Sequence, residues 1–339
     1  MRKLLNTLYV TNPDALVRKK DDALSVSVEG KRVMSVPLHL VEGMVLFGHV
    51  GCSMAVLSAC AQNGIGVALL DERGRFAARV EGPMTGNILL RREQFRRASD
   101  ETACLCIARR FVVAKLHNAR IVLQHYARDY PDCSKVLNPV IEGLGEKKSA
   151  AMVVGALNEL RGIEGDAAHL YFSATNVLLR GCAGISFAGR SRRPPRDPVN
   201  ATLSFFYTIL SREIETACET VGLDPQMGYL HACRSGRASL ALDLIEELRA
   251  PLVDRFVLTL FNRKQLTASD FRSEGEGCFF TDAALKRALG SWQEKKREQF
   301  MHPFLKERMP LGLIPFIQVQ LFARYLRGDL DDYPACLWR

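Results

Sequence analysis

The first part of the chain alternates apolar and polar positions with the two-residue period of β-strands. Residues 24–28 (LSVSV) alternate strictly, and the turn-forming residues 29–32 (EGKR) lead into a returning run of the same kind. A second hairpin is expected over residues 67–80, with its turn at 71–74 (DERG). One helix interrupts the strands at about 53–63. The pattern therefore predicts a small β-rich region that carries one helix.

From residue 88 onward the period becomes helical. Residues 88–128 lack proline and glycine, and their apolar side chains recur at three- and four-residue spacing. Further helices are expected at about 149–161, 164–181, 198–221, 239–262, 282–300 and 313–327. Proline and glycine near residues 82–87 indicate a break between the two patterns. We therefore predict an α+β chain of two domains, a small β domain over 1–87 and a large all-α domain over 88–339.

The charge balance suggests a partner for this chain. The 339 residues include 46 Lys and Arg against 37 Asp and Glu, which gives a formal net charge of +9. Such an excess favours a polyanionic partner, nucleic acid before an anionic membrane surface. The stretch 88–128 is especially basic, and its Arg91 and Arg92 are candidate contacts to a DNA backbone.

The chain shows no sign of export or of membrane insertion. Its start, MRKLLNTLYVT, is too short and too polar for a signal peptide, and no apolar run approaches the roughly 20 residues that span a bilayer. We therefore expect a cytoplasmic protein that does not bind membranes. The ten cysteines form no C-x-x-C pair, and several lie among small apolar residues, so we expect all of them to be reduced and structural.

The stretch 229–255 carries the clearest candidate chemistry. Asp243 and Glu246 are three residues apart, so their side chains are neighbours on a helix, beside a stripe of leucines. His231 precedes the break before that helix, and a turn there would bring its imidazole over both acids. One imidazole with carboxylates suits Mg²⁺ or Mn²⁺, with zinc as an alternative metal. The opposing interpretation is a solvated acidic face and a histidine in ordinary contacts.

A further candidate carboxylate comes from Glu164. It stands between Gly162 and Gly165 at the start of the helix expected over 164–181. The two glycines remove bulk from both sides of the acid, as the close approach of a metal and a phosphate requires. The opposing interpretation is an acid that stabilises the N-terminus of a helix through its dipole.

A basic loop is expected at residues 189–198 (GRSRRPPRDP). Arg190, Arg192, Arg193 and Arg196 lie close together there and would repel one another unless an anion neutralised them. DNA phosphates would do so and would make binding strongly dependent on salt. An exposed surface loop without a ligand is the alternative.

Taken together, these segments resemble the Cas1 family, the CRISPR-associated integrases that insert new spacers into a CRISPR array. The resemblance runs along nearly the whole chain. The matching segments are LNTLYV at 5–10, GIEG at 162–165, DPVNA at 197–201 followed by LSF at 203–205 and Tyr207, His231, and GRASL to DLIE within 236–246. The sequence of the N-terminal region is similar to that of type I-C members.

The resemblance implies an architecture and a set of partners. It predicts an N-terminal β-sandwich, a C-terminal helical catalytic domain, and homodimers formed through the N-terminal half. Two such dimers are expected to flank a dimer of the small companion protein Cas2, and a fragment-trimming Cas4 nuclease is an optional partner.

The resemblance also implies a metal site. The family's ligands correspond to Glu164, His231 and Glu246, with Asp243 as the adjacent supporting acid. Members often have Asp where this chain has Glu246, whose side chain is one methylene longer. The expected metal is Mg²⁺ or Mn²⁺.

The expected reaction is the attack of a DNA 3′-hydroxyl on a phosphodiester at the leader–repeat junction, with Arg192, Arg193 and Arg196 holding the DNA backbone. His231 is an alternative general acid, and Tyr207 is expected to be a core aromatic. Two rival functions are kept open. One is a stand-alone metal-dependent nuclease on branched or single-stranded DNA, and the other is a DNA-binding scaffold in which the acids are structural.

Overall fold

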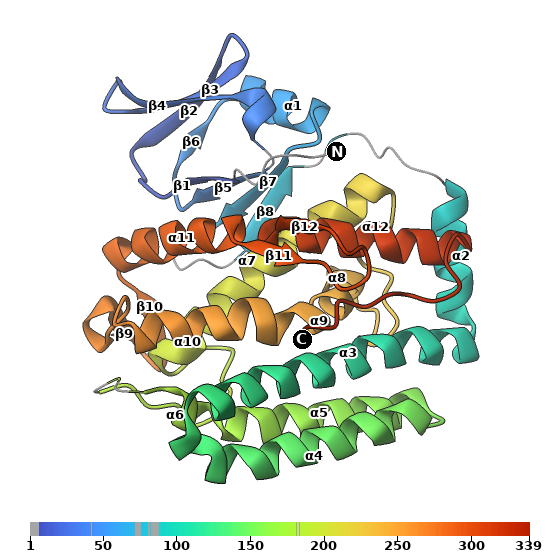
Figure 1. Ribbon diagram of the computed structural model, residues 1–339. Helices are drawn as coiled ribbons and strands as arrows, with labels where there is room; N and C mark the ends of the chain where they lie inside the picture. The colour runs from blue at the N-terminus through green and yellow to red at the C-terminus, as the bar shows by residue number, and fades with distance from the viewer. Residues whose placement is uncertain are drawn as a thin grey trace. The chain divides into compact units, whose positions relative to one another are not determined.

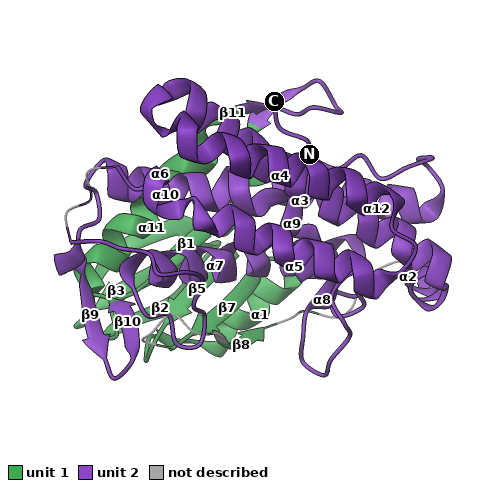
Figure 2. Cartoon of the chain, turned by 90° about the horizontal axis from the view of Figure 1, so that it is seen from below, with its two compact units in different colours: residues 1–85, 280–299, 310–313 green, residues 86–279, 300–309, 314–339 purple. Residues whose placement is uncertain are grey.

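The computed structural model describes residues 7–41, 43–71, 76–80, 82, 88–180, 182 and 184–339. The chain divides into two compact units (Figure 2). The first comprises residues 1–85, 280–299 and 310–313, and the second comprises 86–279, 300–309 and 314–339. The break expected near 82–87 falls almost wholly outside the described residues. Segments from late in the chain therefore complete the first unit.

The first unit contains two four-stranded sheets (Figure 1). One sheet has the strand order β4-β3-β2-β6 and the other has the order β1-β5-β7-β8. The strands are β1 (Thr7–Val10), β2 (Ala15–Lys20), β3 (Ala23–Val28), β4 (Lys31–Pro37), β5 (Gly43–Phe47), β6 (Gly51–Cys52), β7 (Gly66–Leu70) and β8 (Phe76–Val80). The helices α1 (Met54–Gln62) and α11 (Asp282–Arg297) belong to the same unit.

The period-two pattern forms the expected hairpins in this unit. β3 pairs antiparallel with β4, and β7 pairs antiparallel with β8, which confirms both predicted hairpins. The turn predicted at 71–74 lies mostly outside the described residues. The helix predicted at 53–63 is confirmed as α1. Leu24, Met44 and Val56 are fully buried in one apolar core, which the alternating strands and α1 share.

The second unit is mainly helical. Its helices are α2 (Ile88–Ser99), α3 (Glu101–Asp129), α4 (Ser134–Val153), α5 (Leu157–Ser173), α6 (Thr175–Leu178), α7 (Pro198–Val221), α8 (Ser239–Leu244), α9 (Glu246–Leu248), α10 (Arg255–Asn262) and α12 (Ile314–Arg327). Four short strands also follow residue 88, namely β9 (Phe271–Glu274), β10 (Gly277–Phe280), β11 (Gln299–Met301) and β12 (Arg308–Pro310), paired as β9 with β10 and β11 with β12. The expectation that 88–339 is entirely α-helical is therefore wrong. Gly275 explains the first pair, because its φ of +58° allows the tight turn between β9 and β10.

Helix α3 runs through the second unit and packs against α4 and α5, as Figure 1 shows. Phe111, Leu116 and Leu123 on its inner face are buried. The helical pattern over 88–128 is confirmed, but as two helices, because Asp100 ends the first and caps the second. Its side chain accepts a hydrogen bond of 3.0 Å from the backbone N–H of Ala103.

The helices near Glu164 begin elsewhere than the sequence pattern indicated. The structure has α4 and then α5, with the break at 154–156, so the predicted helices 149–161 and 164–181 are corrected to these bounds. Glu164 therefore lies inside α5 and not in a first helical turn. The interpretation of Glu164 as an acid placed there for the helix dipole is thereby removed.

The helix expected over 239–262 is interrupted. α8 and α9 are followed by one turn of π-helix over Arg249–Asp254, and only then does α10 begin. Pro251 is the cause, because proline has no N–H to donate and its ring clashes with the preceding turn, and a wider turn relieves both problems. Ser239 is the first residue of α8, and Ala238 is its N-cap.

No helix in the described part of the chain is long and apolar enough to cross a membrane. All ten cysteines lie within the described residues, and each is a free thiol, so the expectation that they form no disulfides is confirmed.

Candidate active site

A buried carboxylate, Asp243, organises the loop that carries His231. Asp243 is completely buried, and its Oδ2 accepts hydrogen bonds from the backbone N–H groups of Tyr229 (2.6 Å) and Leu230 (3.0 Å). Its Oδ1 accepts from the backbone N–H of His231 at 2.9 Å and lies 2.7 Å from the Nδ1 of the same residue. A carboxylate can only accept, so Nδ1 carries the proton and the Nε2 lone pair points away from Asp243.

Two other helices hold the same loop from outside. Gln94 on α2 is fully buried, and its Nε2 donates to the carbonyl oxygens of Asp224 (2.8 Å) and Met227 (2.9 Å). Arg161 on α5 donates to the carbonyl oxygen of Leu230 at 2.6 Å. These contacts fix the position of His231 before any ligand arrives, which is the support that a functional imidazole needs.

The close contact between this loop and α8 depends on Gly228. A Cβ atom at this position would lie 2.7 Å from the backbone carbon of Ser239 and 2.8 Å from Asp243 Oδ2. Only glycine therefore fits between the loop and the carboxylate.

We predict that Gly228→Ala lowers the free energy of unfolding by about 1–3 kcal/mol, because the methyl group forces the loop away from α8. Urea unfolding checks this value. Gly290→Ala is the matched control, since a Cβ atom there meets nothing within 4 Å. Equal stability of the Gly228→Ala variant and the wild type would contradict the account.

Glu246 lies three residues after Asp243 and faces the same imidazole. It is 3% exposed, and its Oε1 lies 3.9 Å from His231 Nε2. The structure thus brings His231, Asp243 and Glu246 together, as the spacing in the sequence predicted.

Glu164 is connected to Glu246 through Lys115, which was not among the predicted site residues. The ammonium group of Lys115, on α3, forms an ion pair with Glu164 Oε1 and lies 2.7 Å from Glu246 Oε2. The geometry at Glu246 Oε2 is not that of an aligned hydrogen bond, so this contact is mainly electrostatic. Cβ atoms placed on Gly162 and Gly165 would meet no atom within 4 Å, because both glycines are exposed on α5.

The signal for Lys115 is present in the sequence. It lies four residues after Phe111 and four before Ala119, on the apolar face of the stretch 88–128. A lysine at an inward position of an amphipathic helix requires a partner, because burying an unpaired ammonium is costly.

Arg249 and Tyr207 border the site next to Glu246. Arg249 Nε donates to Glu246 Oε1 at 3.0 Å, and its guanidinium lies 4.5 Å from the centre of the Tyr207 ring. Tyr207 is buried, as predicted for a core aromatic, and its hydroxyl donates to Asp254. Burial raises the pKa of Glu246, but Arg249 and Lys115 outweigh this effect and hold the pKa at about 2. Glu246 is therefore ionised at neutral pH.

At Asp254, burial outweighs the other influences on the pKa. Burial raises its pKa from the ordinary 3.8 to about 6, against the hydrogen bond from Tyr207 and the nearby Arg249. The folded protein therefore keeps a proton between about pH 4 and 6 that the unfolded chain has released, and this favours folding at the acidic end of the window.

We predict that the stability contributed by Asp254 is complete below about pH 4 and is lost as the pH rises through 6, a change of roughly 3 kcal/mol. Asp254→Asn keeps an acceptor for Tyr207 and should remove this slope in urea unfolding measured from pH 4 to 7. The exposed Asp129→Asn is the control. An unchanged slope in Asp254→Asn would refute the assignment.

The candidate ligands fit a divalent metal by their chemistry. Among the described residues, no three His, Cys, Asp or Glu side chains stand in positions that would hold a metal ion directly. Glu164 and Glu246 nevertheless already share one cation, the ammonium of Lys115. The imidazole of His231, braced by Asp243, presents its Nε2 toward Glu246, the arrangement in which a carboxylate orients a metal-binding histidine. Once Lys115 is displaced, two carboxylates and one imidazole suit Mg²⁺ or Mn²⁺.

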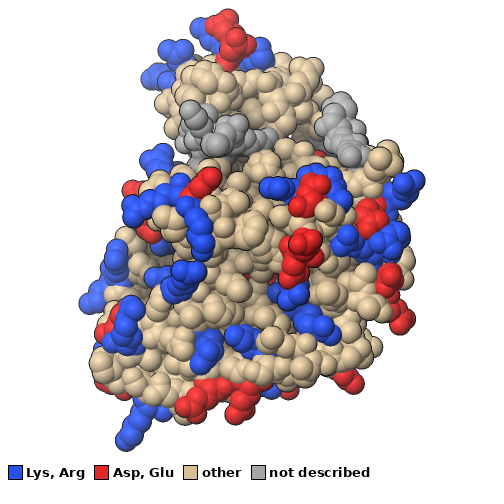
Figure 3. Space-filling model, turned by 45° about the vertical axis from the view of Figure 1, so that its right-hand side comes forward, with Lys and Arg blue, Asp and Glu red and all other residues tan. Residues whose placement is uncertain are grey.

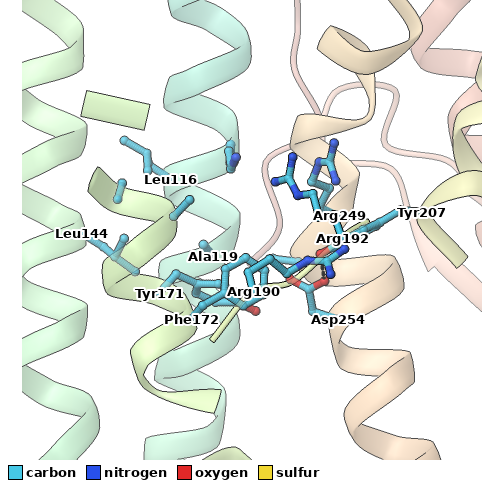
Figure 4. A pocket seen from close by; sticks show the side chains of 14 residues that line it. Leu116, Ala119, Leu144, Tyr171, Phe172, Arg190, Arg192, Tyr207, Arg249 and Asp254 are labelled. Carbon is cyan, nitrogen blue, oxygen red and sulfur yellow. Dashed lines mark hydrogen bonds between the residues drawn. The ribbon is translucent and has the colours of Figure 1, made fainter. Parts of the chain in front are cut away.

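A small cavity of about 40 Å³ adjoins this group (Figure 4). Leu116, Tyr171 and Phe172 line its apolar part. Its cationic part is lined by Lys115, Arg190, Arg192 and Arg249. Figure 4 shows Arg190, Arg192 and Arg249 beside Tyr207 and Asp254, and Arg249 also donates to Glu246 of the candidate catalytic group.

The remaining arginines predicted to bind DNA lie on the surface. Arg192, Arg193 and Arg196 are exposed, and Arg196 pairs with Glu276 at 3.0 Å. On α2, Arg91 is half-buried and Arg92 is exposed. On the face drawn in Figure 3, basic side chains form separate groups with acidic ones between them, and not one continuous patch.

Arg190 fixes the base of the basic loop. It donates to Asn200 Oδ1 at 2.7 Å and to Ser204 Oγ at 3.0 Å, both on α7. Arg190, which was not among the arginines predicted to hold DNA, is thus an anchor of the loop, whereas the three that were predicted to do so are exposed.

Comparison with known proteins identifies the family. Residues 8–294 match the family model described as CRISPR associated protein Cas1. A relative from Rhodospirillum rubrum, named CRISPR-associated endonuclease Cas1 2, is 48% identical over the full length of both chains.

Solved structures share the fold. A casposase bound to integration product matches with a TM-score of 0.84 and 20% identity, over 98% of this chain and 94% of that one. A chain of a Cas6-RT-Cas1–Cas2 complex matches with a TM-score of 0.82 and 23% identity, over 98% of this chain and 36% of that one. With the sequence match over residues 8–294, this places the chain in the Cas1 family of CRISPR-associated proteins.

Proposed function

We propose that the chain is a divalent-metal-dependent DNA endonuclease and integrase of CRISPR adaptation. It would join captured DNA fragments to the CRISPR array by attack of a 3′-hydroxyl on a phosphodiester. The observation that carries this proposal is the buried group in which Asp243 braces His231 toward Glu246, while Lys115 links Glu246 to Glu164. The name of the Rhodospirillum relative and the integration product bound to the casposase support the same reaction class.

Glu164, His231 and Glu246 would hold Mg²⁺ or Mn²⁺. The bound ion would polarise the phosphoryl oxygen and stabilise the charge that develops during transesterification, which is worth several kcal/mol. Asp243 keeps Nδ1 of His231 protonated, so that Nε2 is free to bind. Arg249 holds Glu246 Oε1 from the other side and keeps this carboxylate ionised.

The arginines beside the site would hold the DNA backbone. Arg192 and Arg249 line the cavity next to Lys115, and the exposed Arg193 and Arg196 extend the cationic loop outward. Arg91 and Arg92 on α2 would add contacts farther along the duplex. Guanidinium groups pair with phosphate oxygens in a fork geometry, which gives affinity with little dependence on base sequence.

We propose a homodimer formed through the β-rich region 1–87, with residues 88–339 carrying the catalytic group. The β-sandwich would then serve dimerisation, and the helical domain would serve catalysis. Residues 280–299 belong to the first of these units in the fold. Cas2 is the proposed partner of this dimer, because a structural neighbour is a chain of a Cas6-RT-Cas1–Cas2 complex. Cas4 is a further proposed partner, because a Geobacter sulfurreducens relative that is 36% identical over 98% of this chain is named a Cas4/Cas1 fusion. The type I-C assignment stays a prediction.

An assay that varies the 3′ end of the DNA fragment distinguishes joining from simple cleavage. With Mn²⁺ and a supercoiled target, a fragment with 3′-hydroxyl ends should yield covalently joined products. A fragment with 3′-dideoxy ends should yield none, because it has no nucleophile. Cleavage with both fragments and joining with neither would instead establish the stand-alone nuclease, and DNA binding without either reaction would establish the scaffold.

A further inference from the structure

Lys115 occupies an unusual position for a lysine. Its side chain is 17% exposed and lies on the inner face of α3. Its ammonium group contacts one carboxylate from α5, Glu164, and one from α9, Glu246. Lysine is seldom buried unless it is paired, so these two carboxylates are what make the position stable.

The two partners of Lys115 are also the two carboxylates proposed to hold the metal. An ammonium group and a divalent ion cannot both lie between the same carboxylate oxygens, because each oxygen pair offers one place for a cation and like charges repel. The three carboxylates of Glu164, Asp243 and Glu246 face two cationic side chains, Lys115 and Arg249. With His231 counted as neutral, one negative charge is left over, so the group is electrostatically ready for more positive charge.

The cavity beside Glu164 and Glu246 provides a second position for the ammonium group of Lys115. Lys115 lines it together with Arg190, Arg192 and Arg249. A lysine displaced toward these arginines would join a cluster that suits a phosphate group. The flexible four-carbon stem of lysine, with a compact charge at its end, permits such a change of partner without movement of α3.

We propose that Lys115 is a displaceable counter-ion, which neutralises Glu164 and Glu246 until a divalent metal takes its place and which then positions the DNA phosphate. The inference rests on the proposed function. Lys115 would thus set the metal affinity of the site and couple metal binding to DNA binding.

Metal affinity tests the inference without any measurement of activity. Mn²⁺ binding is measured by calorimetry on the whole protein for the wild type, Lys115→Met and Lys147→Met. Lys147 is the matched control, because it pairs with Asp166 at 3.3 Å on the exposed surface. We expect Lys115→Met to bind Mn²⁺ at least about tenfold more tightly than the wild type, and Lys147→Met to be unchanged. Equal or weaker binding by Lys115→Met would overturn the proposal.

Thermal unfolding provides the second readout and separates the metal site itself from the counter-ion role of Lys115. Without metal, Lys115→Met should unfold at a lower temperature than the wild type, because two carboxylates lose their counter-ion. A fixed concentration of Mn²⁺ should raise its melting temperature more than that of the wild type, since tighter binding stabilises more. Lys115→Gln repeats the measurement if the methionine variant does not fold.

The remaining outcomes are distinct. Absence of Mn²⁺ binding in the wild type and in both variants overturns the metal site and this inference together. Wild-type binding that neither variant changes overturns the inference alone. With Mn²⁺ present, DNA fragments should also bind Lys115→Met more weakly than the wild type, and undiminished binding would overturn the positioning role.

Discussion

Replacing Glu246 by Gln is expected to lower strand transfer by at least about 100-fold while the protein stays folded. Gln keeps the size of the side chain and an oxygen that accepts from Arg249 at the position now 3.0 Å from its Nε. It removes the negative charge that the proposed metal requires. Glu164→Gln and His231→Ala should each cause a loss of similar size, because the three side chains act on one ion.

The control for this prediction lies on the same helix as Glu164. Glu159 is exposed on α5, and Glu159→Ala should keep full strand transfer. Gel assays with 3′-hydroxyl fragments and Mn²⁺ measure the activity, and circular dichroism confirms the fold. Full activity in any two of the three site variants would end the assignment of Glu164, His231 and Glu246 as metal ligands.

Asp243→Asn should produce the second large effect, a loss of about 10–100-fold in strand transfer. Asn can still accept from the backbone N–H groups of Tyr229 and Leu230, so much of the loop geometry is kept. With that oxygen in use, the Asn amide nitrogen takes the place of Oδ1, where it can only donate, so it no longer accepts from His231 Nδ1 and no longer favours the tautomer with Nε2 free.

The affinity for Mn²⁺ measured by calorimetry should fall with the activity of Asp243→Asn. A structural role alone would instead lower stability and leave the metal affinity of the folded protein unchanged. Asp243→Glu does not serve as a rescue, because Asp243 is completely buried and the Gly228 backbone leaves no room for a longer side chain.

The sequence predicted correctly those elements whose signals, such as helix caps, lie next to them along the chain. The helix predicted at 198–221 is α7 with these same bounds, because Asp197 caps its start and Gly222 ends it in the left-handed conformation. His231, Asp243 and Glu246 meet because they are close in sequence, and a single turn between them is enough to bring the imidazole over the acids.

Features that depend on packing between distant segments could not be read in the same way. Pro139, Gly143 and Gly145 suggest a loop, yet they lie inside α4. A Cβ atom on Gly143 would approach the Leu170 side chain to 2.8 Å, so this glycine lets α4 pack closely on α5. Nothing local in the sequence reveals that neighbour.

Lys115 is the clearest case of this limit. Its inward position on α3 follows from the helical period, but its two carboxylate partners come from α5 and α9. Only the fold brings Glu164, 49 residues away, to the same ammonium group as Glu246. The sequence could therefore indicate a buried lysine that needs a partner, but not that it links two of the proposed metal ligands.

The most direct test of the account is the position of the metal itself. Crystals of the protein with Mn²⁺, measured at a wavelength where manganese scatters anomalously, should show one peak at about 2.1 Å from oxygens of Glu164 and Glu246 and from His231 Nε2. Lys115 should have left both carboxylates in the same crystals. A Mn²⁺ peak elsewhere, in crystals of protein that is active in strand transfer, would contradict the account.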